Sequence, residues 1–553
     1  MENIIETKNC KNCSAEFTIT DWDKDMYEKV KAPFPTWCPD CRALRKQSHV
    51  NQINLFKRKC DGTGETIVSN FPPDSPHKIY KQEYWYSDKH DPTDYGRDFD
   101  FSRPFFEQFQ ELLNDVPYPA LFTDYMNDDN SEFTNSAGRN KNCYMIFDSD
   151  ENWDCLNSFG LNNSKNTMES FRGQNHELCY EAIDSKNCYN SYYIHNCENC
   201  IDSMFLNNCI GCKNCIYCSN LNQKEYHVFN EKVSKERYEE IKQGFGSHEF
   251  LADKIEKFEE FRLKYPQKYM HGFKNENCTG DYLINCKDAQ HCYDSMSIWD
   301  GKYCNQIFIK AKDCIDCDEC GEAELVCESV IAGYGSYDIR FSLCCLHQNT
   351  SLTYCNHCFH CKNLFGCAGL NRKEYHIFNK KYSPEEYEQL AAKITEHMKS
   401  TGEWGEFFPT SLSPFGYNLS KAQENFPLTK EEATAKGYKW QDEDKKEFQP
   451  ATNTMLDNIS DAPDETPSHL YACEDCGKNY KIIERELAIY RKMNLALPRL
   501  CFSCRHKKRK TGRNPRQLHD RTCQKCSVEI KTTYSPDRPE IVYCEKCYQE
   551  SLT

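Results

Sequence analysis

Twelve cysteines near the two ends of the chain form six Cys-x2-Cys pairs, and the pairs group into three sets of four. Two such pairs can supply four thiolates to one tetrahedral metal ion, for which zinc is the common choice. Four thiolates leave no position open to water, so the sets predict structural zinc sites. The predicted ligands are Cys10, Cys13, Cys38 and Cys41 in the first set, Cys473, Cys476, Cys501 and Cys504 in the second, and Cys523, Cys526, Cys544 and Cys547 in the third.

The first two sets share one pattern. In both, 24 residues separate the two pairs, and a shift of 463 positions superposes one set on the other. The same shift aligns Phe17 with Tyr480, Ile19 with Ile482, Tyr27 with Tyr490, Pro35 with Pro498 and Arg42 with Arg505. On these residues the segments 1–50 and 469–512 resemble the treble-clef zinc-binding domains, which implies a zinc finger at each. The third set, in 513–553, has 17 residues between its pairs, a spacing typical of a zinc ribbon.

The centre of the chain is a tandem duplication. A shift of 149 positions superposes its copies, which both end in Lys-Glu-Tyr-His-x-Phe-Asn, at 224–230 and 373–379. Within each copy, cysteines recur at nine- and 18-residue intervals among dense asparagines, which predicts a parallel β-solenoid. We therefore expect a multidomain, β-rich protein, with solenoid-like repeats at 136–242 and 284–400 between small zinc domains.

The central cysteines have two interpretations. Runs with three-residue spacing could bind zinc or an iron–sulfur cluster, which would suit metal storage or redox chemistry. They could instead be small buried residues of a core, and Leu364 stands where the first copy has Cys215, which a four-ligand cluster in both copies would not tolerate. The candidate ligands are Cys209, Cys212, Cys215, Cys218, Cys314, Cys317, Cys320, Cys358 and Cys361.

Four further segments connect these units. The aromatic-rich segments 51–135 and 401–441 are expected to pack against the rest of the protein. Residues 243–283 form a charged helical connector, and 442–468, acidic with three prolines, are expected to be a flexible linker. Through its terminal fingers, Tyr95–Phe101 and the repeated motif, the whole chain resembles a class of cysteine-rich multi-zinc-finger bacterial proteins. That resemblance implies zinc binding and supplies no activity.

Charge is unevenly distributed. The net charge is −16, but residues 468–553 hold 18 Lys and Arg against 10 Asp and Glu, which leaves −24 for the rest. Two four-thiolate zinc sites would lower the +8 of this segment to +4. Clustered Lys and Arg bind phosphate backbones, so we predict contact with RNA, DNA or the ribosome; the alternative is a helix face that offsets the thiolates. The candidate residues are Arg505, Lys507, Lys508, Arg509, Lys510, Arg513, Arg516 and Arg521.

The sequence offers no recognisable catalytic constellation and no identified small-molecule substrate. His227 and His376, which occupy matched places in the repeated motif, are interpreted as structural. The leading expectation is a non-enzymatic zinc-binding protein that contacts nucleic acid or a ribonucleoprotein through its basic C-terminal modules. The alternatives are a protein-interaction scaffold with structural zinc and a metal-storage or redox protein. No apolar run approaches the ~20 residues of a membrane span, and paired cysteines without a secretory signal favour the cytoplasm.

Overall fold

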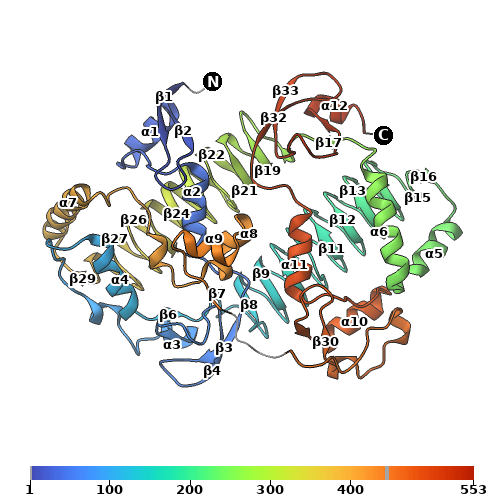
Figure 1. Cartoon of the computed structure of the whole chain (residues 1–553), viewed down its shortest axis with the longest axis horizontal. Helices are drawn as coiled ribbons and strands as arrows, with labels where there is room; N and C mark the ends of the chain where they lie inside the picture. The colour runs from blue at the N-terminus through green and yellow to red at the C-terminus, as the bar shows by residue number, and fades with distance from the viewer. Residues whose placement is uncertain (1–2, 443–447, 553) are drawn as a thin grey trace.

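Parallel strand pairing dominates the protein. The computed structural model describes residues 3–442 and 448–552 (Figure 1). Two stacks of short parallel strands run through its centre, ladder 1 from Thr123 to Lys232 and ladder 2 from Gly272 to Lys381. The chain is thus a multidomain, strand-rich protein with several parallel sheets, as the sequence predicted. No helix in the described ranges is both long enough and apolar enough to cross a membrane.

From Asp129 onward, ladder 1 advances by a constant twelve-residue step along the sequence; only its first step differs, with Thr123 pairing with Ala137. Tyr180 pairs with Tyr192, Tyr192 with Met204, and Met204 with Ile216, all in parallel. Isolated parallel bridges such as Phe159–Phe171 carry the same step through the middle of the ladder. Its strands are β7 (Thr123–Asp124), β8 (Thr134–Gly138), β9 (Tyr144–Asp150), β10 (Leu156–Phe159), β11 (Tyr180–Ile183), β12 (Tyr192–His195), β13 (Met204–Asn207), β14 (Ile216–Ser219), β15 (His227–Val228) and β16 (Glu231–Lys232).

Ladder 2 repeats this construction, although some of its steps are one residue longer, as from Val330 to Leu343. Each ladder ends in an antiparallel hairpin, β15–β16 or β28–β29, whose first strand lies in the repeated motif and whose second strand follows it. A helix follows each hairpin, α5 (Lys235–Gln243) or α7 (Pro384–Thr401), and a serine caps its first turn. The strands of ladder 2 are β18 (Gly272–Phe273), β19 (Gly280–Ile284), β20 (Lys287–Gln290), β21 (Cys292–Met296), β22 (Ile298–Lys302), β23 (Ala311–Asp318), β24 (Gly321–Arg340), β25 (Leu343–Leu346), β26 (Thr350–Thr353), β27 (Lys362–Phe365), β28 (Glu374–Ile377) and β29 (Lys380–Lys381).

A three-residue backbone rhythm explains the composition of the ladders. From Arg139 to Asn157 every third residue has a positive φ, and Gly160 continues the series. Asn, Asp and Gly tolerate that conformation best, which accounts for the dense asparagines. The residue after each such position is buried, as Cys143, Ile146 and Ser149 are. Each step of ladder 1 therefore has four inward positions, and small side chains such as cysteine fill many of them.

This rhythm corrects the nine-residue interval read from the sequence. The true step is the twelve-residue spacing at which Asn152 Nδ2 donates to Asn140 Oδ1, one turn earlier, at 3.0 Å. An interval of nine residues is one step of twelve less the three residues between adjacent inward positions. It therefore joins inward positions on neighbouring steps that are not in the same register. The thiol of Cys179 accordingly donates to the carbonyl of Cys188 at 3.3 Å, nine residues ahead. The nine-residue interval between cysteines thus results from the stacking of the steps, and the period of the ladder is twelve residues.

The terminal modules flank the ladders (Figure 1). Each begins with a hairpin and ends in a helix, and the helices α2 and α11 lie toward the centre of the view. The elements are β1 (Ile4–Asn9), β2 (Glu16–Thr20), α1 (Asp21–Lys29) and α2 (Pro39–Gln47); β30 (Tyr471–Ala472), β31 (Asn479–Tyr480), α10 (Glu484–Met493) and α11 (Phe502–Thr511); and β32 (His519–Thr522), β33 (Glu529–Thr532), β34 (Val542–Tyr543) and α12 (Glu545–Gln549).

The aromatic segments build cores around the ladders. In α4 (Phe105–Asp115) the apolar face is buried with Phe408 and with aromatic residues of ladder 2. The connector contains α6 (His248–Arg262), as its composition suggested. Part of the predicted linker lies outside the described residues. Its second half is hydrogen-bonded to the connector: the Asp457 carboxylate accepts from Ser247 Oγ at 2.6 Å and from the Glu249 N–H at 2.9 Å. An acidic residue is suited to the positive N-terminus of a helix, so this part of the segment is tied to α6.

Candidate metal centres and the helices they anchor

The three cysteine sets converge in space. Within each set, the four Sγ atoms lie within 4.8 Å of one another. The separations Cys13–Cys38, Cys476–Cys501 and Cys526–Cys544 are each 3.7 Å between sulfur atoms. Four sulfurs at ~2.3 Å from a central zinc would be separated by about 3.8 Å. Each set can therefore hold a metal ion.

Backbone N–H groups and an amide support these thiols. In the first set the Cys38 N–H donates to Cys10 Sγ at 3.1 Å, and Asn12 Nδ2 donates to Cys41 Sγ at 3.2 Å. A hydrogen bond with the Cys41 thiol lowers the pKa of Cys38 to about 5. In the second set burial would raise the pKa of Cys473, but neighbouring backbone N–H groups lower it to about 6. Donors of this kind stabilise thiolates, the form that binds metal.

In all three modules the second cysteine pair begins a helix. Cys38, Cys501 and Cys544 are the N-cap residues of α2, α11 and α12. The third module therefore differs from the ribbon expected for 513–553, in which the second pair would lie in another hairpin. A metal ion bound at these positions would fix the start of each helix and hence the direction in which it points.

The central cysteines are buried and hydrogen-bonded. Cys209 Sγ donates to the Cys218 carbonyl at 3.6 Å, and Cys358 Sγ donates to the Cys367 carbonyl at 3.7 Å. In the described part of the chain, the groups of three or more ligand atoms that converge within 4.8 Å are the three terminal sets. Metal binding by the central cysteines stays a prediction. Their burial fits the interpretation that they fill the inward positions of the ladders.

Two arginines in the basic run of the C-terminal module point into the protein. Arg505 and Arg509 of α11 are 7% and 2% exposed, and both contact the buried carboxylate of Glu169 in ladder 1. The Arg505–Glu169 separation is 2.8 Å. Although burial would raise the pKa of Glu169, the two guanidinium groups lower it. Two of the predicted phosphate-binding residues thus have an intramolecular partner.

The N-terminal module docks in a matching way on ladder 2. Arg42 Nε lies 2.8 Å from the buried carboxylate of Asp316, and Lys46 Nζ lies 3.9 Å from it. The shift of 463 places Arg42 on Arg505 and Lys46 on Arg509. Both arginines also donate to the carbonyl five residues earlier. The two modules therefore place equivalent basic residues against a buried acid. Each module packs on the ladder that lies farther from it in the sequence.

Sequence reasoning missed these acids. A shift of 147 positions places Glu169 on Asp316 and Glu181 on Glu328, and Glu328 in turn pairs with Arg45 at 2.7 Å. The sequence does contain these matched acids, but the shift that relates them is 147 and not the 149 that superposes the two copies. The two shifts differ because some steps of ladder 2 are one residue longer than those of ladder 1. It could not be recognised without knowing which helix would pack there.

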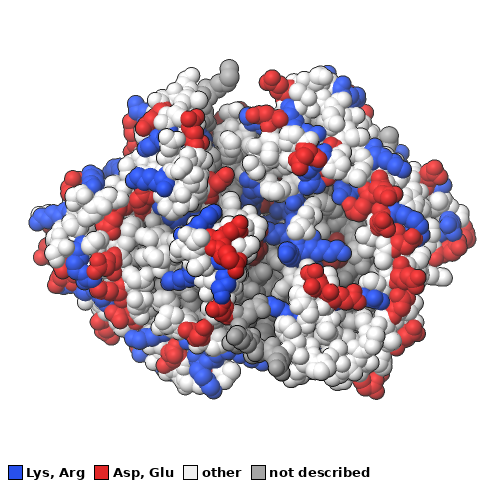
Figure 2. Space-filling model, viewed as in Figure 1, with Lys and Arg blue, Asp and Glu red and all other residues white. Residues whose placement is uncertain are grey.

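The remaining basic candidates divide into two groups. Arg513 and Arg516 contact the buried Asp294, and Lys510 lies 2.9 Å from Glu424, so three more cations have acidic partners. Lys507 and Lys508 are exposed, and Arg521 donates to the Ser535 carbonyl. In Figure 2, Lys and Arg are interspersed with Asp and Glu over the visible face. Nucleic-acid binding stays a prediction that now depends mainly on Lys507 and Lys508.

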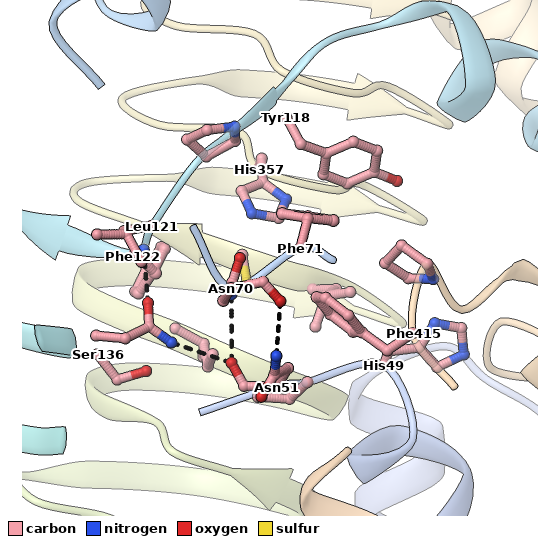
Figure 3. Close-up of a pocket in the computed structure, with 17 residues that line it drawn as sticks. His49, Asn51, Asn70, Phe71, Tyr118, Leu121, Phe122, Ser136, His357 and Phe415 are labelled. Carbon is pink, nitrogen blue, oxygen red and sulfur yellow. Dashed lines mark hydrogen bonds between the residues drawn. The ribbon is translucent and has the colours of Figure 1, made fainter. Parts of the chain in front are cut away.

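A small cavity lies where the segment after α2 meets ladder 2 (Figure 3). Its volume is about 30 Å³, which is enough for a water molecule and far below the ~300 Å³ of a ligand pocket. Asn51 Nδ2 donates to the Asn70 carbonyl at 2.6 Å, and Asn135 Nδ2 donates to the Asn51 carbonyl at 3.0 Å. These amides tie three segments together, so we assign the cavity to packing.

Comparison with known proteins assigns no family. No family model and no curated protein matches the chain. One solved structure, described as a candidate acetyltransferase from Desulfovibrio desulfuricans G20, is 9% identical to this chain, and the match covers 50% of this chain and 81% of that one. Its TM-score is 0.11, so the similarity carries no argument about fold or activity.

Proposed function

We propose that this protein is a non-enzymatic scaffold in which three structural zinc sites hold terminal modules against two β-solenoids. The observation that carries the proposal is the matched docking of α2 and α11, whose basic faces are buried on Asp316 and Glu169. Each of these modules thus uses its basic helix to hold another part of the same chain, and we call such a module a clamp. The zinc sites then serve to orient the clamps.

Zinc is the metal that suits the three sites. The cysteine sets offer four soft thiolates at near-tetrahedral separations, and such closed sites are typical of structural zinc. The modules are short, and around the cysteines of the first one the buried apolar residues are few, such as Phe17 and Ile19. Metal binding would thus contribute much of their folding free energy.

The solenoid assignment rests on the repeated register. Parallel pairing with a repeated step, four inward positions per step and a three-residue φ rhythm support a coil with stacked turns. Coils of this kind are rigid and expose long files of side chains, which suits a scaffold.

Both ladders expose the same file of side chains. In ladder 1 successive register positions are Asp129, Lys141, Trp153, Lys165 and Glu177, and in ladder 2 they are Glu276, Lys287, Trp299, Lys312 and Glu324. We call these the tryptophan files. Trp153 and Trp299 are 46% and 44% exposed, so each presents a large apolar surface to solvent.

The chemistry of the tryptophan files favours a protein partner. A tryptophan surrounded by mixed charges is a common centre of protein–protein contact. The acids at both ends of each file would repel a phosphate backbone. The matched files offer one partner segment two equivalent places of contact.

Substitution of the two tryptophans tests the proposal. In nuclease-treated extract, crosslinking followed by mass spectrometry should identify partner peptides joined to the lysines of the files. The double variant Trp153→Ala/Trp299→Ala should reduce that yield at least tenfold, whereas Tyr337→Ala, another exposed aromatic of ladder 2, should leave it unchanged. Equal yields from all three proteins, or loss of the complexes on nuclease treatment, would contradict the proposal.

A further inference from the structure

The correspondence between the two ends of the chain continues past the first zinc module. The shift of 463 that relates the fingers also places residues 60–85 on residues 523–548, the third module. It aligns Cys60 with Cys523, Ile67 with Ile530, Phe71 with Tyr534, Pro73 with Pro536, Asp74 with Asp537, Pro76 with Pro539, Tyr80 with Tyr543 and Trp85 with Tyr548. The other three ligand positions of the third module are occupied by Thr63, Lys81 and Tyr84.

The two segments also have the same secondary structure at the same displacement. The shift that relates the fingers carries the starts of β3 (Phe56–Lys59), β4 (Thr66–Ser69), β5 (Ile79–Tyr80) and α3 (Gln82–Trp85) onto the starts of β32, β33, β34 and α12. Their pairings agree as well, since β3–β4 and β32–β33 are antiparallel hairpins in equivalent register.

The turn that would hold the metal is preserved. The Cys60 N–H donates to the Glu65 carbonyl and the Gly64 N–H donates to the Cys60 carbonyl, both at 2.8 Å. Cys523 makes the same two bonds, with Val528 and Ser527, at the same distance. Cys60 Sγ accepts from the Lys81 N–H at 3.3 Å, as Cys10 Sγ accepts from the Cys38 N–H.

The replaced positions have taken other roles. A lysine ammonium has no lone pair to offer a cation, and Lys81 Nζ lies 2.6 Å from Glu65 at the surface. The Tyr84 ring covers the turn so closely that a Cβ on Gly62 would lie 2.6 Å from its Cε1 atom. An aromatic ring therefore packs on the turn that, in the third module, supplies two of the metal ligands.

Both segments join the chain to the start of a ladder. Strand β5 pairs in parallel with β6 (Tyr118–Pro119), and β34 pairs in parallel with β17 (Gln267–Lys268). The Ala120 N–H donates to the Tyr80 carbonyl at 2.8 Å, and the Tyr269 N–H donates to the Tyr543 carbonyl at 3.0 Å. The shift of 149 that relates the ladders also relates β6 to β17.

We propose that residues 56–85 are a fourth module of this kind, which makes the junction with ladder 1 without a metal ion and can become a fourth zinc site when its three missing ligands are restored. The tandem of two modules at each end then bridges both ladders, but the two tandems differ in metal dependence. The proposal rests on the proposed function only in assuming that the third module binds zinc.

Restoring the ligands tests the proposal directly. The variant Thr63→Cys/Lys81→Cys/Tyr84→Cys should bind one more equivalent of zinc than the wild-type chain, and its Co²⁺ form should show one more equivalent of tetrahedral thiolate absorption. A matched variant with serine at these three positions should show no increase. A folded cysteine variant with the wild-type metal content would overturn the proposal. Absence of zinc from the wild type would instead contradict the proposed function, so the two failures are distinct.

Hydrogen exchange of the unmodified chain provides a second measurement, which decides the matter if the variant does not fold. On addition of a chelator, the amide of Tyr269 at the β17–β34 junction should lose protection at least tenfold. The amide of Ala120 at the β5–β6 junction should change less than twofold. Equal loss at both junctions would overturn the proposal.

Discussion

At the scale of single residues, the protein is organised around a few buried acids. Glu169 in ladder 1 and Asp316 in ladder 2 each receive two cations from a terminal helix. Removing one partner from a buried ion pair leaves an uncompensated charge, which costs far more than losing a surface pair. These acids therefore determine where the modules bind.

We expect Glu169→Gln to lower the free energy of unfolding by about 3 kcal/mol, because it removes the carboxylate closest to the buried Arg505 and Arg509. Their remaining acidic partners, Glu486 at 3.5 Å and Glu181 at 3.4 Å, are farther away. Glu198→Gln is the matched control on the same ladder, since Glu198 forms a partly exposed pair with Lys186 and should cost less than ~1 kcal/mol. Urea denaturation of both variants measures the difference. Similar losses in the two would contradict the assigned role of Glu169.

The same carboxylates make stability depend on pH. Although burial opposes the shift, nearby arginines lower the pKa of Glu169 and of Asp294 in the folded state. Their contribution is therefore fully present above the ordinary carboxyl pKa, about 4, and is lost as the pH falls through the lower folded-state pKa. We expect the stability difference between wild type and Glu169→Gln to narrow progressively below about pH 4. If the stability difference between wild type and Glu169→Gln widens on acidification, the pKa of Glu169 is raised and not lowered in the folded state.

At the scale of elements, α2, α11 and α12 each begin at a cysteine of one candidate metal site. A chain with three closed sites should bind three equivalents of zinc. The variant Cys504→Ser should lower the zinc affinity of the second site and should expose α11 to protease. Cys60→Ser is the control, because Cys60 belongs to none of the three groups. Elemental analysis with limited proteolysis measures both effects, and unchanged zinc content in Cys504→Ser would argue against the second site.

At the scale of the whole molecule, charge is used mainly between parts of the chain. Five of the eight basic candidates in the C-terminal segment contact acids of the body or of the preceding segment. Few cations are then left for an external phosphate backbone, and the net charge of −16 would repel one.

We accordingly expect binding to mixed-sequence RNA and DNA no stronger than the ~10⁻⁴–10⁻⁶ M of non-specific contact at physiological salt. Fluorescence anisotropy across a salt series measures it. Submicromolar binding that Lys507→Glu/Lys508→Glu abolishes would restore nucleic-acid contact as the function.

The sequence predicts the local features well and the long-range ones poorly. The spacing of cysteines within each short module predicts the metal ligands. The repeated sequence of the centre predicts the duplication and the parallel pairing of strands. The docking of α11 was not predictable, because Arg509 and Glu169 are 340 residues apart and a basic run looks the same whether it faces solvent or a buried acid. Residues 56–85 escaped recognition because three of four ligands are replaced, and a search for cysteine pairs passes over the shared prolines and aromatics.

The swapped docking has a consequence for biosynthesis. Arg42 meets Asp316, which lies 274 residues further along the chain. At ~5–20 residues per second, about 14–55 s of synthesis separate the first cysteine module from the surface that will receive it. During that interval the module has no ladder to pack on, and a bound metal ion is what can keep its helix formed. Zinc supply during translation would then influence how much of the newly made chain reaches the clamped state.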